Sequence, residues 1–180
     1  IMQAMEGKAC DGDYSRSKTS CISSEELLCV VKARYPTAEP LVKQCIIEYI
    51  NDNKMIKGDT VTHFMRLYEE NRDQDIKYLV QKFLNKTFAP RYVQWETLSF
   101  NVVREFLEDV SLGEWEFLRV ESIMQWAEGN SSKKDEIVEL FTKLVCYNKI
   151  PKEYLKLVLK PFRKKILPEH GLELICGVHE

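Results

Sequence analysis

Residues 98–130, LSFNVVREFLEDVSLGEWEFLRVESIMQWAEGN, contain two helix patterns separated by a short break. Ser99 suits the cap of the first helix, because its hydroxyl can accept a hydrogen bond from an unpaired amide of the first turn. Asp109–Gly113 forms the break, and Gly129 helps to end the second helix. Apolar residues recur at helical spacing on one face of each helix: Val102, Val103, Phe106 and Leu107, then Val120, Ile123, Met124 and Ala127, with Trp126 at the margin. The stretch predicts a helical hairpin.

The same helix signals occur on both sides of this hairpin. Ser23 and Glu26 form a capping box, and Pro36 stops the helix that follows it. Pro40 suits the first turn of the next helix, where a missing N–H costs nothing, and Asp59 is the expected N-cap of a third. The helices expected outside 98–130 are 24–34, 40–50, 60–70, 74–89, 135–146 and 151–159.

No stretch alternates apolar and polar residues in the manner of a half-buried strand, so the predicted fold is all-α, built from antiparallel helical hairpins. The intervals between hairpins do not match a repeat of fixed length. A single irregular helical domain is therefore expected, with residues 1–22 as a loop or the remnant of a preceding domain and 166–180 as a tail. Pro161 and Pro168 are expected to interrupt the chain on the way into that tail.

The 180 residues are 44% hydrophobic and 30% charged, which is typical of a packed fold. A net charge of −2 gives no long-range attraction to nucleic acid or acidic membranes. The longest apolar run, Leu27–Val31, is far shorter than the roughly 20 residues that cross a bilayer. No membrane association is expected. The chain begins with Ile1 rather than Met, which suggests a piece of a longer protein.

The six cysteines are scattered, and three of them, Cys29, Cys45 and Cys146, lie inside apolar stretches. A free cysteine in such a position behaves as a small core residue. The helix that starts at Pro40 has one of these cysteines on its expected buried face, which consists of Val42, Cys45, Ile46, Tyr49 and Ile50. Free, buried thiols indicate a reducing compartment, so a cytoplasmic or nuclear location is expected.

The order of these helices resembles the BTB-BACK family of adaptor proteins, which includes the BTB-Kelch proteins. Residues 25–53 resemble the last two helices of a BTB domain, and 59–88 resemble the helix pair that follows it. The stretch 98–130 resembles BACK through Leu98-Ser99, Val120-Glu121-Ser122 and Trp126, and LFTKLVCYNKIPKEYL at 140–155 is similar to the next BACK helix and turn. The resemblance implies BTB-like helices over 23–53 and a BACK-like domain over 54–165.

Two parts of the family pattern are missing. The strand-rich half of BTB, which carries most of its dimer interface, is absent unless residues 1–22 are its remnant, and no Kelch repeats follow. The dimerisation and client-binding roles of the family therefore do not transfer to this chain. Whether the intact protein forms a homodimer is left open.

The resemblance implies a non-enzymatic adaptor that recruits a client to a cullin-type ubiquitin ligase, with the pair at 59–88 forming part of the groove for the scaffold. His63, Leu67 and Asn71 share a helix face beside the expected buried stripe and are the candidate partner-binding residues. The alternative is a structural scaffold or oligomerisation domain without ubiquitin chemistry, because both functions need helices, a groove and no catalytic residues.

Catalytic, metal and nucleic-acid sites find little support. The chain contains no His-Glu-x-x-His, Gly-x-Ser-x-Gly or phosphate-loop motif, so no catalytic residue and no cofactor is expected. Cys176, His179 and His170 lack a fourth zinc ligand and paired spacing, and no metal site is expected. The basic run at 152–165 is interpreted as a solvated helix face rather than a nucleic-acid site. Trp126 is expected in the core, and Trp95 and Trp115 are expected to be half-exposed near helix breaks.

Overall fold

The computed structural model describes residues 24–86 and 89–167, and these residues are all-α, with no strand among them, as the sequence predicts. The long helices begin and end close to the expected positions, except that the helix expected at 74–89 ends five residues early, at Leu84. They are α1 (Ser24–Arg34), α2 (Pro40–Asp52), α3 (Val61–Asn71), α4 (Gln74–Leu84), α5 (Phe100–Asp109), α6 (Glu116–Gly129) and α7 (Lys134–Leu144). The chain then forms α8 (Lys152–Tyr154), the π-helical turn η5 (Leu155–Leu159) and α9 (Lys160–Ile166). Short 3₁₀ turns lie between the helices: η1 (Ala89–Tyr92), η2 (Trp95–Thr97), η3 (Gly113–Trp115) and η4 (Tyr147–Lys149).

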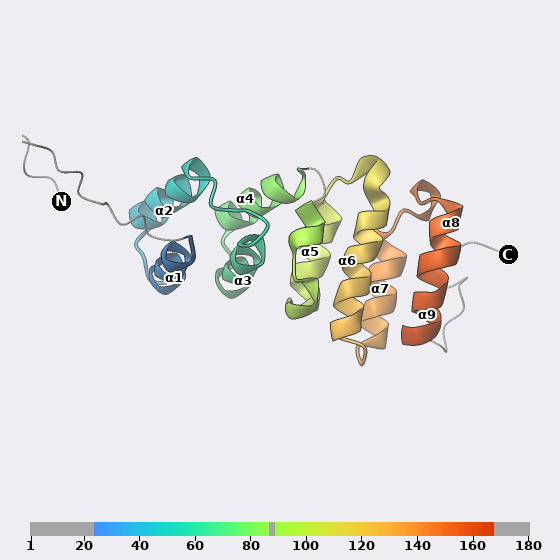
Figure 1. Ribbon diagram of the computed structural model, residues 1–180. Helices are drawn as coiled ribbons and strands as arrows, with labels where there is room; N and C mark the ends of the chain where they lie inside the picture. The colour runs from blue at the N-terminus through green and yellow to red at the C-terminus, as the bar shows by residue number, and fades with distance from the viewer. Residues whose placement is uncertain (1–23, 87–88, 168–180) are drawn as a thin grey trace, which may run out of the picture.

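The helices follow one another in a row, from α1 and α2 at one end to α8 and α9 at the other (Figure 1). Some neighbours along the chain pack together, as α3 does on α4 and α6 on α7. Other contacts skip one helix, since α2 packs on α4 and α5 on α7. The turn η2 lies against α6 and joins the two halves of the row. The described part of the chain contains no helix with the length and apolar character needed to span a bilayer.

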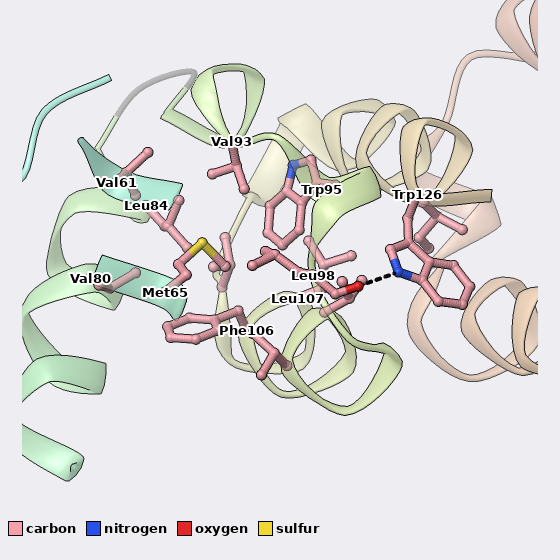
Figure 2. Packing of buried hydrophobic residues seen from close by; sticks show 14 of the residues in the cluster. Val61, Met65, Val80, Leu84, Val93, Trp95, Leu98, Phe106, Leu107 and Trp126 are labelled. Carbon is pink, nitrogen blue, oxygen red and sulfur yellow. Dashed lines mark hydrogen bonds between the residues drawn. The ribbon is translucent and has the colours of Figure 1, made fainter. Parts of the chain in front are cut away.

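The buried side chains form one continuous cluster that extends from Leu28 to Leu167. Trp126 lies in this core, as predicted, and its indole N–H donates a 2.9 Å hydrogen bond to the Leu98 carbonyl (Figure 2). Trp95 is also fully buried, so the expectation of a half-exposed ring is wrong. Its position in η2 turns the ring inward, and its N–H is satisfied by the Pro90 carbonyl at 2.9 Å. Trp115 is 46% exposed, as expected.

The third helix starts one residue later than the sequence indicates, because Thr60 rather than Asp59 is its N-cap. The Thr60 hydroxyl is buried and donates a 2.6 Å hydrogen bond to the Met55 carbonyl. It also accepts one of 2.9 Å from the Lys57 amide. The side chain therefore fastens the loop before α3 instead of capping the helix. The expected cap of α1, Ser23, lies outside the described residues.

The predicted helix at 151–159 continues past its expected end, because α9 runs through Pro161 to Ile166. A proline inside a helix removes an N–H and clashes with the carbonyl four residues earlier, here that of Leu157. The π-helical turn η5 contains that carbonyl and widens the helix there, which lets the chain remain helical. The tail therefore does not begin at Pro161 or at residue 166. Residues 168–180 lie outside the described range.

The three cysteines that the structure describes are free thiols, but they are exposed rather than buried, which corrects the expectation for Cys29, Cys45 and Cys146. For Cys29 and Cys45, the reason is the small buried face of the first hairpin, formed by α1 and α2. Only Ile50 is fully buried on α2, so the predicted apolar face of that helix points partly to solvent, with Val42 and Tyr49 about half-exposed. Helical spacing identified an apolar face, but the neighbouring helices do not cover it.

A buried ion pair joins three segments of the second half of the row. Arg119 Nε lies 2.9 Å from Glu116 Oε1, and both side chains are almost fully buried. Arg119 also donates a 2.9 Å hydrogen bond to the Val110 carbonyl, and the Cys146 amide donates one of 3.0 Å to Glu116. The pair therefore links the end of α5, the start of α6 and the turn after α7, and its polar atoms are partnered as a buried charge requires.

Candidate functional site

A pocket of about 350 Å³ opens between the C-terminal halves of α2 and α4. We call it the α2–α4 groove. Its apolar lining comes from both helices and from the loop after α2, and consists of Ile50, Ile56, Leu79 and Phe83. Its polar lining consists of Asn51, Asp52, Lys54, Lys82 and Lys86. The groove thus combines an apolar surface with three lysines and one carboxylate.

The wall of the groove on the α2 side is shaped by the loop between α2 and α3. Lys54 takes a left-handed backbone conformation, with φ of 49°, which turns the chain sharply after the helix. Met55 is then buried, and its carbonyl accepts the hydrogen bond from Thr60 described above. This loop places Ile56 in the groove lining.

The wall on the α4 side is set by the start of that helix. The Asp73 carboxylate accepts hydrogen bonds from the amides of Asp75 and Ile76, so it caps α4 and fixes where the helix begins. Ten residues later, Phe83 is only partly buried. Lys82 Nζ lies 3.4 Å from Asn51 Oδ1 and bridges the two walls at the exposed edge of the groove.

The charge of the groove follows from its three lysines. All three are exposed and lie around a partly buried aromatic ring, so the groove offers apolar contact with a positive edge. Such a surface favours an apolar side chain that is flanked by carboxylates. No described group in it has the arrangement of a metal site, since no cluster of three or more His, Cys, Asp or Glu occurs within residues 24–86 and 89–167.

The three candidate residues from the sequence lie together on α3, but they do not line the groove. His63 is half-buried, and its Nδ1 lies 3.0 Å from Lys32 Nζ. Leu67 is 1% exposed and belongs to the core, so the expectation that it offers an anchor at the surface is wrong. Asn71 donates a 2.9 Å hydrogen bond to the Leu67 carbonyl and closes the end of the helix.

Leu67 is buried because α3 is covered on a broader face than the predicted stripe allowed. Thr62 and Leu67 are buried in addition to the stripe that helical spacing predicts, which consists of Val61, Phe64, Met65 and Tyr68. The groove residues in and just after α4 were accessible to sequence reasoning, since Lys82 and Lys86 are four residues apart and Phe83 between them belongs to an apolar stripe. Ile56 carried no such signal, because it follows an irregular turn. Cys176, His179 and His170, for which the sequence predicts no zinc site, lie outside the described residues.

No protein-family model, curated protein or solved structure matches this chain. The chemistry of the site is therefore taken from its geometry. A pocket with apolar walls and a positive edge is suited to binding a side chain of a partner.

Proposed function

We propose that the protein is a non-enzymatic interaction adaptor that acts as a substrate-recruiting component of a cullin-type ubiquitin ligase, with the α2–α4 groove as the surface for the scaffold. The observation that supports this proposal is the position of the groove. Its walls come from α2, within the segment that resembles the end of BTB, and from α4, within the helix pair that resembles the segment after BTB. The resemblance implies a scaffold groove at this junction.

The lining of the groove defines what the scaffold must supply. An apolar side chain that enters between Ile56 and Phe83 loses its contact with water, and full burial of a leucine-sized group contributes about 1.5–3 kcal/mol. Carboxylates beside it would lie near Lys82 and Lys86 and would add specificity and a faster association rate. The bound segment is thus an apolar residue with acidic neighbours.

The test is titration of the chain with the N-terminal helical domain of a cullin, followed by calorimetry. Phe83→Ala removes the partly buried ring from the groove and is expected to weaken binding by about tenfold or more. His63→Ala and Asn71→Ala on α3 are the matched controls and are expected to leave the affinity within about twofold. Absence of cullin binding by the folded wild-type chain rejects the proposal, and so does equal weakening by the control variants.

The alternative, a scaffold or oligomerisation domain without ubiquitin chemistry, is favoured by one observation. Leu41, Val42 and Tyr49 on α2 are exposed apolar residues. Several exposed apolar residues on the same helix are typical of a contact surface when they form one patch. Sedimentation equilibrium separates the two functions. Self-association that Leu41→Asp abolishes, in a chain that does not bind the cullin domain, establishes the alternative.

A further inference from the structure

The last helical segment carries four lysines at intervals of four residues: Lys152, Lys156, Lys160 and Lys164. The first, second and fourth are exposed, and Lys160 is half-buried. This segment lies at the end of the row opposite to α2 (Figure 1), so it is separate from the α2–α4 groove. We call these four side chains the lysine ridge.

The π-helical turn determines how straight the ridge is. In a regular α-helix, four residues advance the chain by about 40° more than one full turn, so three such steps rotate a row of side chains by about 120°. A π-helical turn takes in more residues per turn, and each residue therefore rotates the helix by less. Because η5 occupies Leu155–Leu159, in the middle of the ridge, the drift is smaller than in a regular α-helix, which favours a position of the four lysines on one side of the segment.

The charge of this segment is strongly one-sided. Residues 149–166 contain seven basic side chains and one acidic one, Glu153, in a chain whose net charge is −2. One of the basic residues, Lys165, is already paired with Glu128 at 3.3 Å. Lys152, Lys156 and Lys164 form no ion pair within the described residues. Their like charges repel one another, and a complementary surface would relieve that repulsion.

An apolar side chain beside the lysines favours a protein partner over a nucleic acid or a lipid surface. Leu157 is 76% exposed, and it neighbours Lys156 in sequence and Lys160 three residues on, one helical turn away. A phosphate backbone gains nothing from an exposed leucine, and one leucine anchors a protein to a lipid surface only weakly. A helix of another protein uses both features, because it can place carboxylates against the lysines and an apolar residue against Leu157.

We propose that the lysine ridge and Leu157 are a docking surface for an acidic amphipathic helix of a partner protein. Steps of four residues along a helix correspond to about 6 Å. A partner helix with glutamates at the same four-residue spacing therefore places carboxylates opposite the exposed lysines of the ridge, Lys152, Lys156 and Lys164. This surface is independent of the proposed cullin groove.

The probe is a fluorescein-labelled synthetic helix of 18 residues with Glu at every fourth position and Leu beside them. A control peptide has the same composition, with the glutamates distributed around the helix. Anisotropy titration of the full chain is expected to give at least tenfold tighter binding of the first peptide, with an affinity that falls as salt is raised. Equal binding of the two peptides, or binding of neither, overturns the proposal.

Charge reversal locates the binding surface. The triple variant Lys152→Glu, Lys156→Glu and Lys164→Glu is expected to raise the Kd at least tenfold, and Leu157→Asn severalfold. The matched control, Lys54→Glu, Lys82→Glu and Lys86→Glu, changes the net charge equally but alters the α2–α4 groove. Because the groove also favours an apolar residue with acidic neighbours, this variant removes any peptide binding there. Binding at the ridge is expected to keep its Kd within about twofold while cullin binding weakens, so failure of this proposal is distinguishable from failure of the proposed function.

The other classes of partner are tested with the same variants. A 20-nucleotide polyuridine and vesicles with 30% phosphatidylserine are expected to bind at least tenfold more weakly than the acidic helix at the same salt concentration. Tighter binding of either one, lost in the ridge variant, overturns the proposal in favour of a polyanion or a membrane. Each variant is expected to fold, because the three replaced lysines are exposed. Circular dichroism checks this.

Discussion

The indole N–H of Trp126 donates a hydrogen bond of 2.9 Å to the carbonyl oxygen of Leu98 (Figure 2). Trp126 lies on α6, and Leu98 lies between η2 and α5, so this bond holds the two halves of the row of helices together. Both groups are buried, and neither can be satisfied by water if the other is removed.

Replacing Trp126 by Phe is expected to lower the free energy of unfolding by about 1–3 kcal/mol, because the Leu98 carbonyl is left without a donor in the core. Urea unfolding followed by circular dichroism measures this change. Trp115→Phe is the control, since that ring is half-exposed and a change below about 1 kcal/mol is expected. Equal effects of the two variants would contradict a special role for the buried bond.

Breaking the Glu116–Arg119 pair from one side is expected to cost about 3–5 kcal/mol, because the remaining charge stays buried without its partner. The variants are Glu116→Leu and Arg119→Met. The double variant is expected to cost clearly less than the sum of the two single ones, although the Cys146 amide and Val110 carbonyl lose partners in it. Thermal unfolding of all four proteins completes the cycle, and strict additivity is the result that would refute the coupling.

The pair of Lys77 and Asp109, with Nζ and Oδ2 2.9 Å apart, ties α4 to the end of α5. The hydrogen bond from Lys77 lowers the pKa of Asp109 below its ordinary value. A group whose pKa is lower in the folded state than in the unfolded state stabilises the protein at pH values above its unfolded-state pKa. This stabilisation is lost as the pH falls through the folded-state pKa. Asp109→Asn is therefore expected to be less stable than wild type at pH 7, by less than about 1 kcal/mol because the carboxylate is 45% exposed.

The stability difference between wild type and Asp109→Asn is expected to close as the pH falls below about 4, the ordinary pKa of an aspartate, and through the lowered pKa of Asp109 in the folded state. Urea unfolding at a series of pH values measures it. A difference that stays constant over this range would show that the carboxylate charge has no part in the contact.

The exposed thiols of Cys29, Cys45 and Cys146 are expected to react with a maleimide in the folded protein, without denaturant. Peptide mapping by mass spectrometry assigns the label to each position. Ser replacement at each of the three is expected to change stability by less than about 0.5 kcal/mol, as at other surface positions. Protection of any of the three until unfolding would indicate that a partner or a further segment covers it.

Helix positions could be predicted from the sequence wherever the signals are local. The start of α2 at Pro40 and the buried stripe of α5 depend on backbone geometry and on spacing within one helix, and both are confirmed. The thiols of α1 and α2 show where such reasoning ends. An apolar face is buried only if another helix covers it, and that depends on contacts far apart in the sequence.

The candidate site was less predictable for the same reason. Leu67 was placed at the surface by its position beside a helical stripe, but α3 is covered on both edges of that stripe. The α2–α4 groove joins residues about 30 positions apart, such as Asn51 and Lys82, and no local pattern reports that proximity. Pro161 predicted the end of a helix, but the helix continues through it, because the π-helical turn η5 makes room for the proline.

The small buried face of α2 leaves one wall of the groove weakly anchored. With only Ile50 fully buried on this helix, its local opening requires much less free energy than global unfolding. A bound partner must hold that wall in place, so part of its binding energy is used to order α2. Occupancy of the groove is therefore expected to have a signature in hydrogen exchange: the amides of α2 exchange more slowly, while those of α6, a helix with eight buried residues, keep their rates.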